Sequence, residues 1–292
     1  MDARLVEALA AGERAGGGCA LLPPRRAPGG TAGLLLTRHS GNSIDFREHR
    51  EYHPGDDVRR IDWNVYARSD SLMVRMHHEE MAPHADIVVD LSRSMSLGGT
   101  KKAEATLGLV AMLAEAATNG GFSRAVWGAG DEVKRIETNG PASSWTGLEF
   151  AGRGSPAASL ARSGPSWKPF GMRIFVSDLL WLGDPGQLVR QLAHRAAAVV
   201  IVQLLAARDL APERSGNARL VDSESGETLD ALVDDAALFR YSSALRRHQE
   251  NWNDEARRGE AVMLTMTAEE LVDGWRVGPL AERGILERRR TA

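Results

Sequence analysis

The stretch Asp86–Ser96 reads D-I-V-V-D-L-S-R-S-M-S, and it decides the fold of this chain. Its apolar, β-branched run Ile87–Val89 predicts a short buried strand that ends at Asp90. Hydroxyl side chains then occupy alternate positions, at Ser92, Ser94 and Ser96. A Gly-Gly pair follows, and residues 101–119 have the spacing of a helix. The loop between this strand and this helix therefore carries one carboxylate and two or three hydroxyls.

Oxygen side chains in such a loop favour a hard cation. Ligands of α/β proteins bind at the carboxyl ends of strands, and Mg²⁺ prefers oxygen ligands, keeps several waters and takes few direct protein ligands. The spacing D-x-S-x-S, matched by Asp90, Ser92 and Ser94, is similar to the metal-ion-dependent adhesion site of von Willebrand factor A domains. The alternative is an ordinary turn built on Asp and Ser side chains.

A second buried strand, Met172–Val176, ends in Ser177-Asp178. If it lies beside the first strand, Asp178 and Asp90 meet at one edge of the sheet. Two neighbouring carboxylates repel unless a cation lies between them or one of them takes up a proton. A metal ion is the simplest resolution. The alternative is that Asp178 caps a helix or a turn.

A third segment, the loop before the helical residues 157–161, contributes another hydroxyl. Ser155 followed by Pro156 predicts an N-cap and the first position of a helix. In von Willebrand A domains a threonine in the corresponding loop reaches the metal, and Ser155 keeps that hydroxyl. The resemblance therefore implies a site for Mg²⁺ or Mn²⁺ made by Asp90, Ser92, Ser94, Ser155 and Asp178.

From residue 85 onward, strand patterns alternate with helix patterns, which predicts an α/β fold with a doubly wound, mostly parallel sheet and helices on both faces. The predicted strands are 85–90, 122–128, 132–137, 172–177 and 197–204. The predicted helices are 101–119, 156–163, 184–195, 234–258, 268–275 and 279–289. Residues 217–230 predict a hairpin around Ser225-Gly226.

Ahead of this α/β domain, 83–292, the pattern predicts two smaller parts. Residues 1–30 form a short amphipathic helix, over 2–14, and a connector rich in Gly, Pro and Arg. Residues 31–82 form a small β-rich segment, with a short strand at Leu34–Thr37 and another at Leu72–His77. Between them, apolar residues alternate with polar ones as in a half-buried strand or a single irregular turn, at Ile61, Trp63 and Val65.

Composition excludes several classes of protein. The 292 residues are 43% hydrophobic and 26% charged with a net charge of −3, which argues against non-specific binding to nucleic acid. The single cysteine, Cys19, cannot form an internal disulfide and fits a cytoplasmic location. No stretch approaches 18 consecutive apolar residues, so we expect no membrane insertion.

A long motif precedes the first buried strand. Gly41–Trp63 reads G-N-S-I-D-F-R-E-H-R-E-Y-H-P-G-D-D-V-R-R-I-D-W. Its second half supplies the residues expected to act as a structural scaffold or as a partner-binding surface: Tyr52, Pro54, Gly55, Asp56, Asp57, Arg59, Asp62 and Trp63. The motif contains enough acidic and basic side chains to form a charge network. Such a network would fix the local geometry more than it would raise the stability of the fold.

With these motifs, the chain resembles the bacterial domain-of-unknown-function family fifty-eight, most strongly over Arg38–Met95 and more loosely to about residue 270. The resemblance implies a von Willebrand A-like fold preceded by a small β-rich segment. It also implies association with AAA+ ATPases of the MoxR type, and a role in presenting or remodelling client proteins without catalytic activity.

The sequence supports two hypotheses about function, from different classes, and a third alternative. The first is a non-enzymatic protein-interaction module, in which Mg²⁺ keeps one position open for a carboxylate of a partner. The second is a metal-dependent hydrolase that acts on phosphoesters, with the metal activating water or clamping a phosphate. The third is a scaffold whose site stays empty.

Overall fold

Two units make up the protein, which is seen here in a computed structural model that describes residues 2–23, 46–53, 56, 58, 61–77, 83–213 and 216–289. The larger unit combines Met1–Gly33 with Pro83–Ala292, and the smaller unit is Leu34–Ala82.

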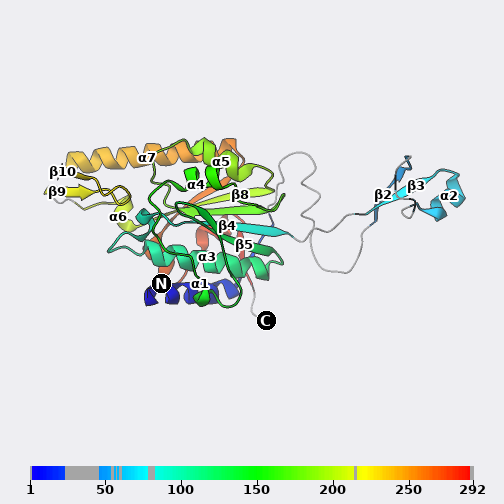
Figure 1. The fold of residues 1–292 in the computed structure, drawn as a ribbon, viewed down its shortest axis with the longest axis horizontal. Coiled ribbons are helices and arrows are strands. Elements are labelled where there is room, and N and C mark those ends of the chain that lie inside the picture. Colours follow the sequence, from blue (N-terminus) through cyan, green and yellow to red (C-terminus); the bar gives the residue numbers. More distant parts are fainter. Residues whose placement is uncertain are drawn as a thin grey trace. The chain divides into compact units, whose positions relative to one another are not determined.

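A six-stranded sheet lies at the centre of the larger unit, with strand order β11-β8-β7-β4-β5-β6 (Figure 1). The strands are β4 His84–Asp90, β5 Ser123–Ala129, β6 Val133–Ile136, β7 Met172–Ser177, β8 Ala198–Leu205 and β11 Val262–Thr267. All neighbours pair in parallel except β5 and β6. Every residue of β4 and β7 is buried, as expected for parallel strands covered on both faces. The prediction of an α/β fold with a mostly parallel sheet is confirmed.

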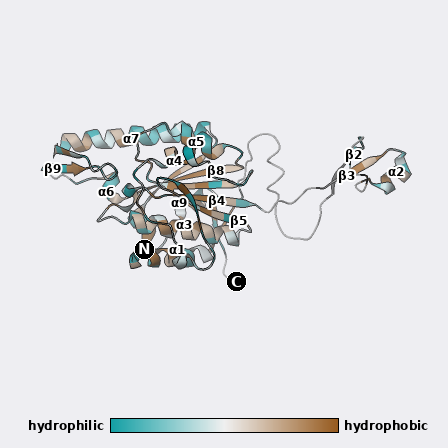
Figure 2. Ribbon diagram, in the orientation of Figure 1, coloured by the Kyte–Doolittle hydropathy of each residue, from teal (hydrophilic) through white to brown (hydrophobic). Residues whose placement is uncertain are grey.

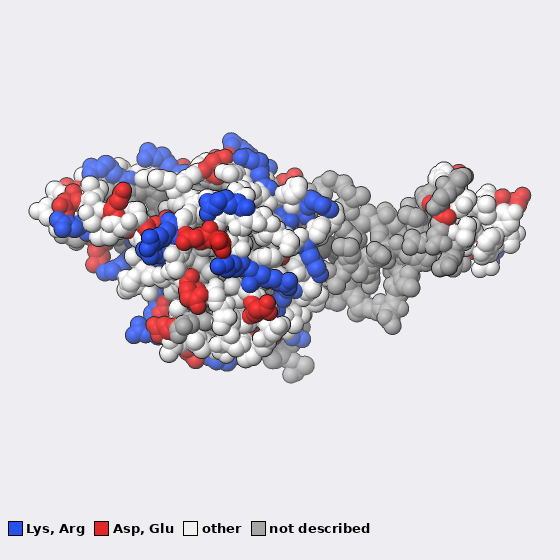
Figure 3. All heavy atoms as spheres, in the orientation of Figure 1, with Lys and Arg blue, Asp and Glu red and all other residues white. Residues whose placement is uncertain are grey.

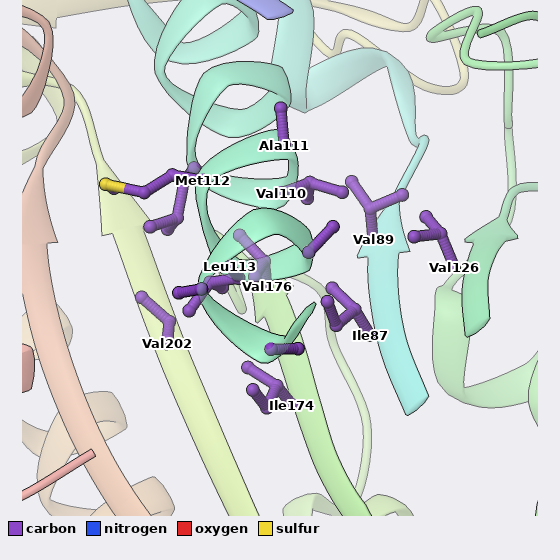
Figure 4. Packing of buried hydrophobic residues seen from close by; sticks show 14 of the residues in the cluster. Ile87, Val89, Val110, Ala111, Met112, Leu113, Val126, Ile174, Val176 and Val202 are labelled. Atoms are coloured by element: carbon purple, nitrogen blue, oxygen red, sulfur yellow. The ribbon is translucent and has the colours of Figure 1, made fainter. Parts of the chain in front are cut away.

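Helix α3, Lys102–Asn119, covers one face of the sheet. Figure 4 shows its side chains interdigitating with apolar side chains of β4, β5, β7 and β8. Helix α1, Ala3–Gly17, packs on the outer side of α3, so α3 is buried nearly all round. The two helices approach so closely that a Cβ atom at Gly12 would lie 1.9 Å from the carbonyl oxygen of Gly108. The N-terminal helix, set apart in the sequence analysis, thus belongs to the larger unit.

The opposite face of the sheet is covered by α4 Pro156–Ser163, α5 Pro185–Ala193 and α7 Asp235–Arg258. Helix α7 reaches this core chiefly through Trp252, which is almost completely buried and packs edge-to-face with Trp181. Most of its remaining surface is polar, whereas the central strands are apolar (Figure 2). This contrast is typical of a helix that lies on the outside of a sheet.

Two strands near the C-terminus differ from the expectation. Strand β11 was not predicted, and it extends the parallel sheet beyond β8. The helix predicted over 279–289 is wrong in its second half. Helix α9 is only Gly278–Glu282, and Gly284, with φ +66°, turns the chain into strand β12, Leu286–Arg288. This strand pairs with β1, Cys19–Leu21, a partner that is remote in sequence.

The expected hairpin is present as β9 Gly216–Val221 and β10 Thr228–Val233. It follows the short helix α6, Ala207–Leu210, and it precedes α7. Because α6 begins directly after β8, the hairpin lies at the end of the unit where the parallel strands terminate (Figure 1). Helix α8, Ala268–Val272, and the 3-10 turns Arg93–Ser96 and Ala142–Ser144 complete the unit.

In the smaller unit, β2 Phe46–Glu51 pairs antiparallel with β3 Met73–His77, which confirms the second predicted strand. The alternation at Trp63 and Val65 does not form a strand. Helix α2, Trp63–Ser69, begins there because the carboxylate of Asp62 accepts hydrogen bonds from the backbone of Asn64 and Val65. The strand predicted at Leu34–Thr37 lies outside the described residues.

Within the described ranges, no helix is both long enough and apolar enough to cross a membrane. On the face of the larger unit shown in Figure 3, Lys and Arg side chains are interspersed with Asp and Glu.

Candidate functional site

The two predicted acidic strand ends meet. Strands β4 and β7 are direct neighbours in the sheet, and they pair in parallel. Asp90 ends β4, and Asp178 directly follows β7. Both are almost fully buried, at 0% and 1% exposure. The expectation that these carboxylates share one edge of the sheet is therefore met by the strand pairing.

Asp90 is held by uncharged donors. Its Oδ1 accepts a hydrogen bond from the backbone of Ser92 at 2.8 Å, and its Oδ2 accepts one from Ser177 Oγ at 2.6 Å. Burial is the main cause that raises the pKa of Asp90 to about 7, the negative charge of Asp178 adds to the rise, and the hydrogen bonds from Ser177 and Ser92 oppose it. The charge of Asp90 is thus poorly compensated.

The two serines of the D-x-S-x-S motif face each other. Ser92 Oγ and Ser94 Oγ are 3.0 Å apart, and Ser92 is buried beside Asp90. The third hydroxyl of the series, Ser96 Oγ, instead donates to the carbonyl oxygen of Arg93. The structure therefore brings together two of the three alternating hydroxyls.

Asp178 has a cationic partner that the sequence analysis did not assign. Lys102, in the first turn of α3, places its Nζ 2.6 Å from Asp178 Oδ2 and 3.1 Å from Asp209 Oδ2 of α6. Burial alone disfavours the charged lysine, but the two carboxylates outweigh this effect, and the pKa of Lys102 is raised. One of the two strand ends thus carries its own ammonium ion.

The turn after β7 is tightly fixed. Leu179 has a φ of +60°, which is strained for a residue with a branched side chain. Its backbone N–H donates to Ser177 Oγ, and its carbonyl oxygen lies 2.6 Å from His248 Nε2 of α7. The carbonyl oxygen of Asp178 accepts a hydrogen bond from Gln203 Nε2 of β8. These contacts hold Asp178 toward α3.

Ser155 has the predicted position at the start of α4. Its Oγ accepts a hydrogen bond from the backbone of Ala158, so it is the N-cap of that helix, with Pro156 at the first position. The loop before it runs beside the motif, because Gly152 exchanges two backbone hydrogen bonds with Leu91 and Arg93. The hydroxyl of Ser155 is committed to its helix in this structure, and its loop lies next to the D-x-S-x-S motif.

A further carboxylate, Glu224, lies half-buried in the turn between β9 and β10. Burial is the first cause that raises the pKa of Glu224, and the charges of Asp178 and Asp222 are the next. The hairpin turn therefore lies near enough to Asp178 for the two negative charges to repel.

The motif of the smaller unit is described in part. Asp56 Oδ2 accepts a hydrogen bond from the backbone of His53, and Asp62 caps α2. Trp63 is 60% exposed and packs edge-to-face with Tyr66. The side chain of Tyr52 is half-buried. The remaining motif residues lie outside the described part of the chain: Pro54, Gly55, Asp57 and Arg59.

Sequence reasoning missed Lys102, Ser177 and Glu224. Lys102 could have been recognised because it begins a largely apolar helix. Thr106, one turn later on the same face, is buried as well. The sequence pattern marks Ser177 only as the neighbour of Asp178. The sequence holds no signal for Glu224, because nothing in a hairpin pattern tells what its turn contacts. The described residues contain no group of three or more His, Cys, Asp or Glu side chains arranged for a metal.

Residues 48–251 match the family described as "Protein of unknown function DUF58". The chain belongs to the DUF58 family. This match spans most of the chain, from β2 of the smaller unit into α7.

Relatives of this DUF58 protein include the uncharacterized protein Rv1480 of Mycobacterium tuberculosis (strain ATCC 25618 / H37Rv) and the uncharacterized protein Mb1516 of Mycobacterium bovis. Each is 29% identical over 224 residues, which cover 69% of this chain and 68% of the relative.

Among solved structures, the chain is similar to the conserved hypothetical protein BatB from Bacteroides thetaiotaomicron, with 10% identity, 69% of this chain and 98% of that chain covered, and a TM-score of 0.37. It is also similar to an aerotolerance-related membrane protein from Bacteroides fragilis, with 13% identity, 66% and 96% coverage, and a TM-score of 0.37.

Proposed function

We propose that this DUF58 protein is a non-enzymatic protein-interaction module with a Mg²⁺-dependent site of the von Willebrand A type. Its larger unit would bind a carboxylate of a partner protein through a metal ion at the edge of the sheet. The described site offers oxygen atoms from carboxyl groups and hydroxyls, which is the ligand chemistry that Mg²⁺ and Mn²⁺ prefer.

The single observation that carries the proposal is the distance between two hydroxyl oxygens. Octahedral Mg²⁺ binds oxygen at about 2.1 Å, so neighbouring ligands lie about 3.0 Å apart. Ser92 Oγ and Ser94 Oγ are 3.0 Å apart, beside a buried carboxylate whose charge has only uncharged partners. The residues present therefore fit such an ion.

Ser92, Ser94 and Asp90 would hold the ion, and Asp178 would add negative charge nearby. A bound ion would act as a Lewis acid that accepts a carboxylate oxygen of a partner. Ser177 orients Asp90 through its hydroxyl, and Lys102 holds Asp178 in place through their ion pair. Ser155, on the adjoining loop, would be a ligand only after its hydroxyl leaves the start of α4.

A MoxR-type AAA+ ATPase is the partner that the family resemblance favours, with assembly or remodelling of client proteins as the task. The smaller unit supplies a second surface for such a partner. Trp63 is 60% exposed within the longest motif of the chain, and exposed aromatic side chains are frequent anchors of protein interfaces.

Calorimetric titration of Mg²⁺ and Mn²⁺ into chelator-stripped protein tests the site. We expect binding by the unmodified protein, none by Asp90→Ala, and unchanged binding by Asp254→Ala, which removes an exposed aspartate of α7. Loss of binding in both variants, or in neither, would contradict the assignment.

One observation favours a second candidate, a scaffold that works without a metal. Lys102 already neutralises Asp178, so part of the acidic edge is stable with protein groups alone. Absence of metal binding, together with an unchanged affinity of Asp90→Ala for the ATPase, would select this candidate.

A further inference from the structure

The amino ends of β4 and β5 carry a series of polar side chains that the proposed function does not use. His84 is the first residue of β4, and Ser123, its partner in the parallel register, is the first residue of β5. Ser123 Oγ lies 2.9 Å from His84 Nδ1, and His84 Nε2 lies 3.3 Å from Asp86 Oδ1. A hydroxyl, an imidazole and a carboxylate are thus joined in the order that activates a nucleophilic serine.

Exposure to solvent falls along this series. Ser123 is exposed, whereas His84 is 8% exposed and Asp86 is 1% exposed. Because side chains alternate along a strand, His84 and Asp86 point to the same face of the sheet. Trp127 Nε1 of β5 also donates to Asp86 Oδ1, at 2.9 Å, so the carboxylate is held in position from the neighbouring strand. The hydroxyl is therefore accessible to a reagent, while the two groups behind it are shielded from water.

These contacts determine which nitrogen of His84 carries the proton. A carboxylate has only acceptor atoms, so His84 Nε2 is the donor to Asp86 Oδ1. In the neutral imidazole, Nδ1 then keeps a lone pair, and Ser123 Oγ is the donor to it. The carbonyl oxygen of Pro83, the other acceptor near this hydroxyl, is farther away, at 3.3 Å. The hydroxyl proton is thus directed at a base that can remove it.

The surroundings also favour the positive charge that His84 gains when it takes up that proton. In the described part of the chain, Asp86 Oδ2 is buried and has no hydrogen-bond partner. Arg173, the register partner of Asp86 on β7, donates instead to the carbonyl oxygens of Leu192 and His194 at the end of α5. An imidazolium at His84 would therefore be a cation hydrogen-bonded to Asp86, and such an opposite charge stabilises it.

We propose that Ser123 is a nucleophile with His84 as its general base, and that it accepts an acyl group from an activated ester. Ser123 Oγ bonds to the carbonyl carbon, and the bond between that carbon and the departing oxygen breaks. The hydroxyl proton passes through His84 Nδ1 to the departing oxygen, which leaves an ester on Ser123 and a free alcohol. This inference is independent of the cation site, because Asp90 lies at the opposite end of β4. A single acylation modifies the chain and requires no turnover.

Acetylation of the full chain by p-nitrophenyl acetate tests the proposal, in a buffer that contains a chelator so that no metal takes part. Mass spectrometry of the digested protein gives the rate of acetylation at each serine. Ser144 is the matched internal control, because it is also exposed and its hydroxyl donates to a proline carbonyl oxygen, that of Pro141. We expect Ser123 to react about a hundredfold faster than Ser144, which is the usual contribution of a general base.

His84→Gln removes the base, and it should slow acetylation of Ser123 to about the rate of Ser144, with the rate at Ser144 unchanged. The comparison of the two serines in the unmodified protein needs no variant, so it decides the question even if His84→Gln does not fold. Equal rates at Ser123 and Ser144 in the unmodified protein would overturn the inference. So would a rate at Ser123 that a folded His84→Gln variant leaves unchanged.

Discussion

The ends of β4 and β7 lie side by side, and they solve the same electrostatic problem in different ways. Asp178 has an ammonium ion 2.6 Å away, supplied by Lys102. Asp90 has a backbone amide and a hydroxyl as partners, and its pKa is raised to about 7. Both carboxylates are buried.

This difference distinguishes a carboxylate with a structural role, Asp178, from one that remains available to a ligand, Asp90. A buried ion pair satisfies Asp178 within the fold, and breaking such a pair leaves an uncompensated charge. Asp90 keeps a deficit of positive charge next to two hydroxyls at the spacing of metal ligands. An ion-paired carboxylate thus lies beside one whose hydrogen-bond partners are uncharged, as the proposed cation site requires. The predictions below test this asymmetry.

The largest effect is expected for Lys102→Met, which leaves Asp178 and Asp209 without their ammonium partner. We expect a loss of about 3–5 kcal/mol in the free energy of unfolding, measured by urea denaturation. Lys101→Met is the matched control. Lys101 is half exposed, so its replacement should change the free energy of unfolding by less than about 0.5 kcal/mol. Equal losses in both variants would show that Lys102 does not compensate Asp178.

The second effect depends on pH and belongs to Asp90. Its pKa is raised from 3.8 to about 7, so between these values the folded protein holds a proton that the unfolded chain releases. The metal-free protein should therefore lose stability as pH rises from about 4 to about 7. Asp90→Asn has no such proton, and at about pH 8 it should be more stable than the unmodified protein by up to about 4 kcal/mol.

Thermal unfolding at about pH 4 and about pH 8 measures this difference, with Asp254→Asn as the exposed control. A gap between Asp90→Asn and the unmodified protein that stays constant with pH would mean that Asp90 is already compensated in the fold.

The third effect is stabilisation by Mg²⁺. At a concentration of one hundred times Kd, a metal that binds only the folded state adds about 2.7 kcal/mol. Ser94→Ala should lose this gain, whereas Ser96→Ala should keep it, because Ser96 Oγ is directed to the carbonyl oxygen of Arg93. Melting curves with and without Mg²⁺ measure this stabilisation. If Mg²⁺ still raised the melting temperature of Ser94→Ala, the role of the paired hydroxyls would be refuted.

The smallest effect is expected for Asp209→Asn. Lys102 keeps its closer partner, Asp178, and the amide oxygen still accepts a hydrogen bond. We expect a loss of about 1 kcal/mol in urea denaturation. A loss of stability as large as that of Lys102→Met would mean that Lys102 mainly compensates Asp209 of α6, and not Asp178 at the end of β7.

Much of this molecule was readable in its sequence. The apolar runs at Ile87–Val89 and Ile174–Val176 predicted buried parallel strands, because only covered strands are apolar on both faces. Ser155 before Pro156 predicted the start of α4 from local chemistry alone. By contrast, Trp63 and Val65 alternate like a strand, and the capping carboxylate of Asp62 makes them helical.

The sequence by itself determined which oxygen atoms stand at the ends of β4 and β7, since strand and loop patterns are local. Only the tertiary structure decided how their charges are balanced. Lys102 meets Asp178 across 76 positions in the sequence, and it also meets Asp209 of α6. Burial, which raises the pKa of Asp90, likewise depends on how the elements pack around the ends of the strands, where Lys102 of α3 and Asp209 of α6 meet Asp178.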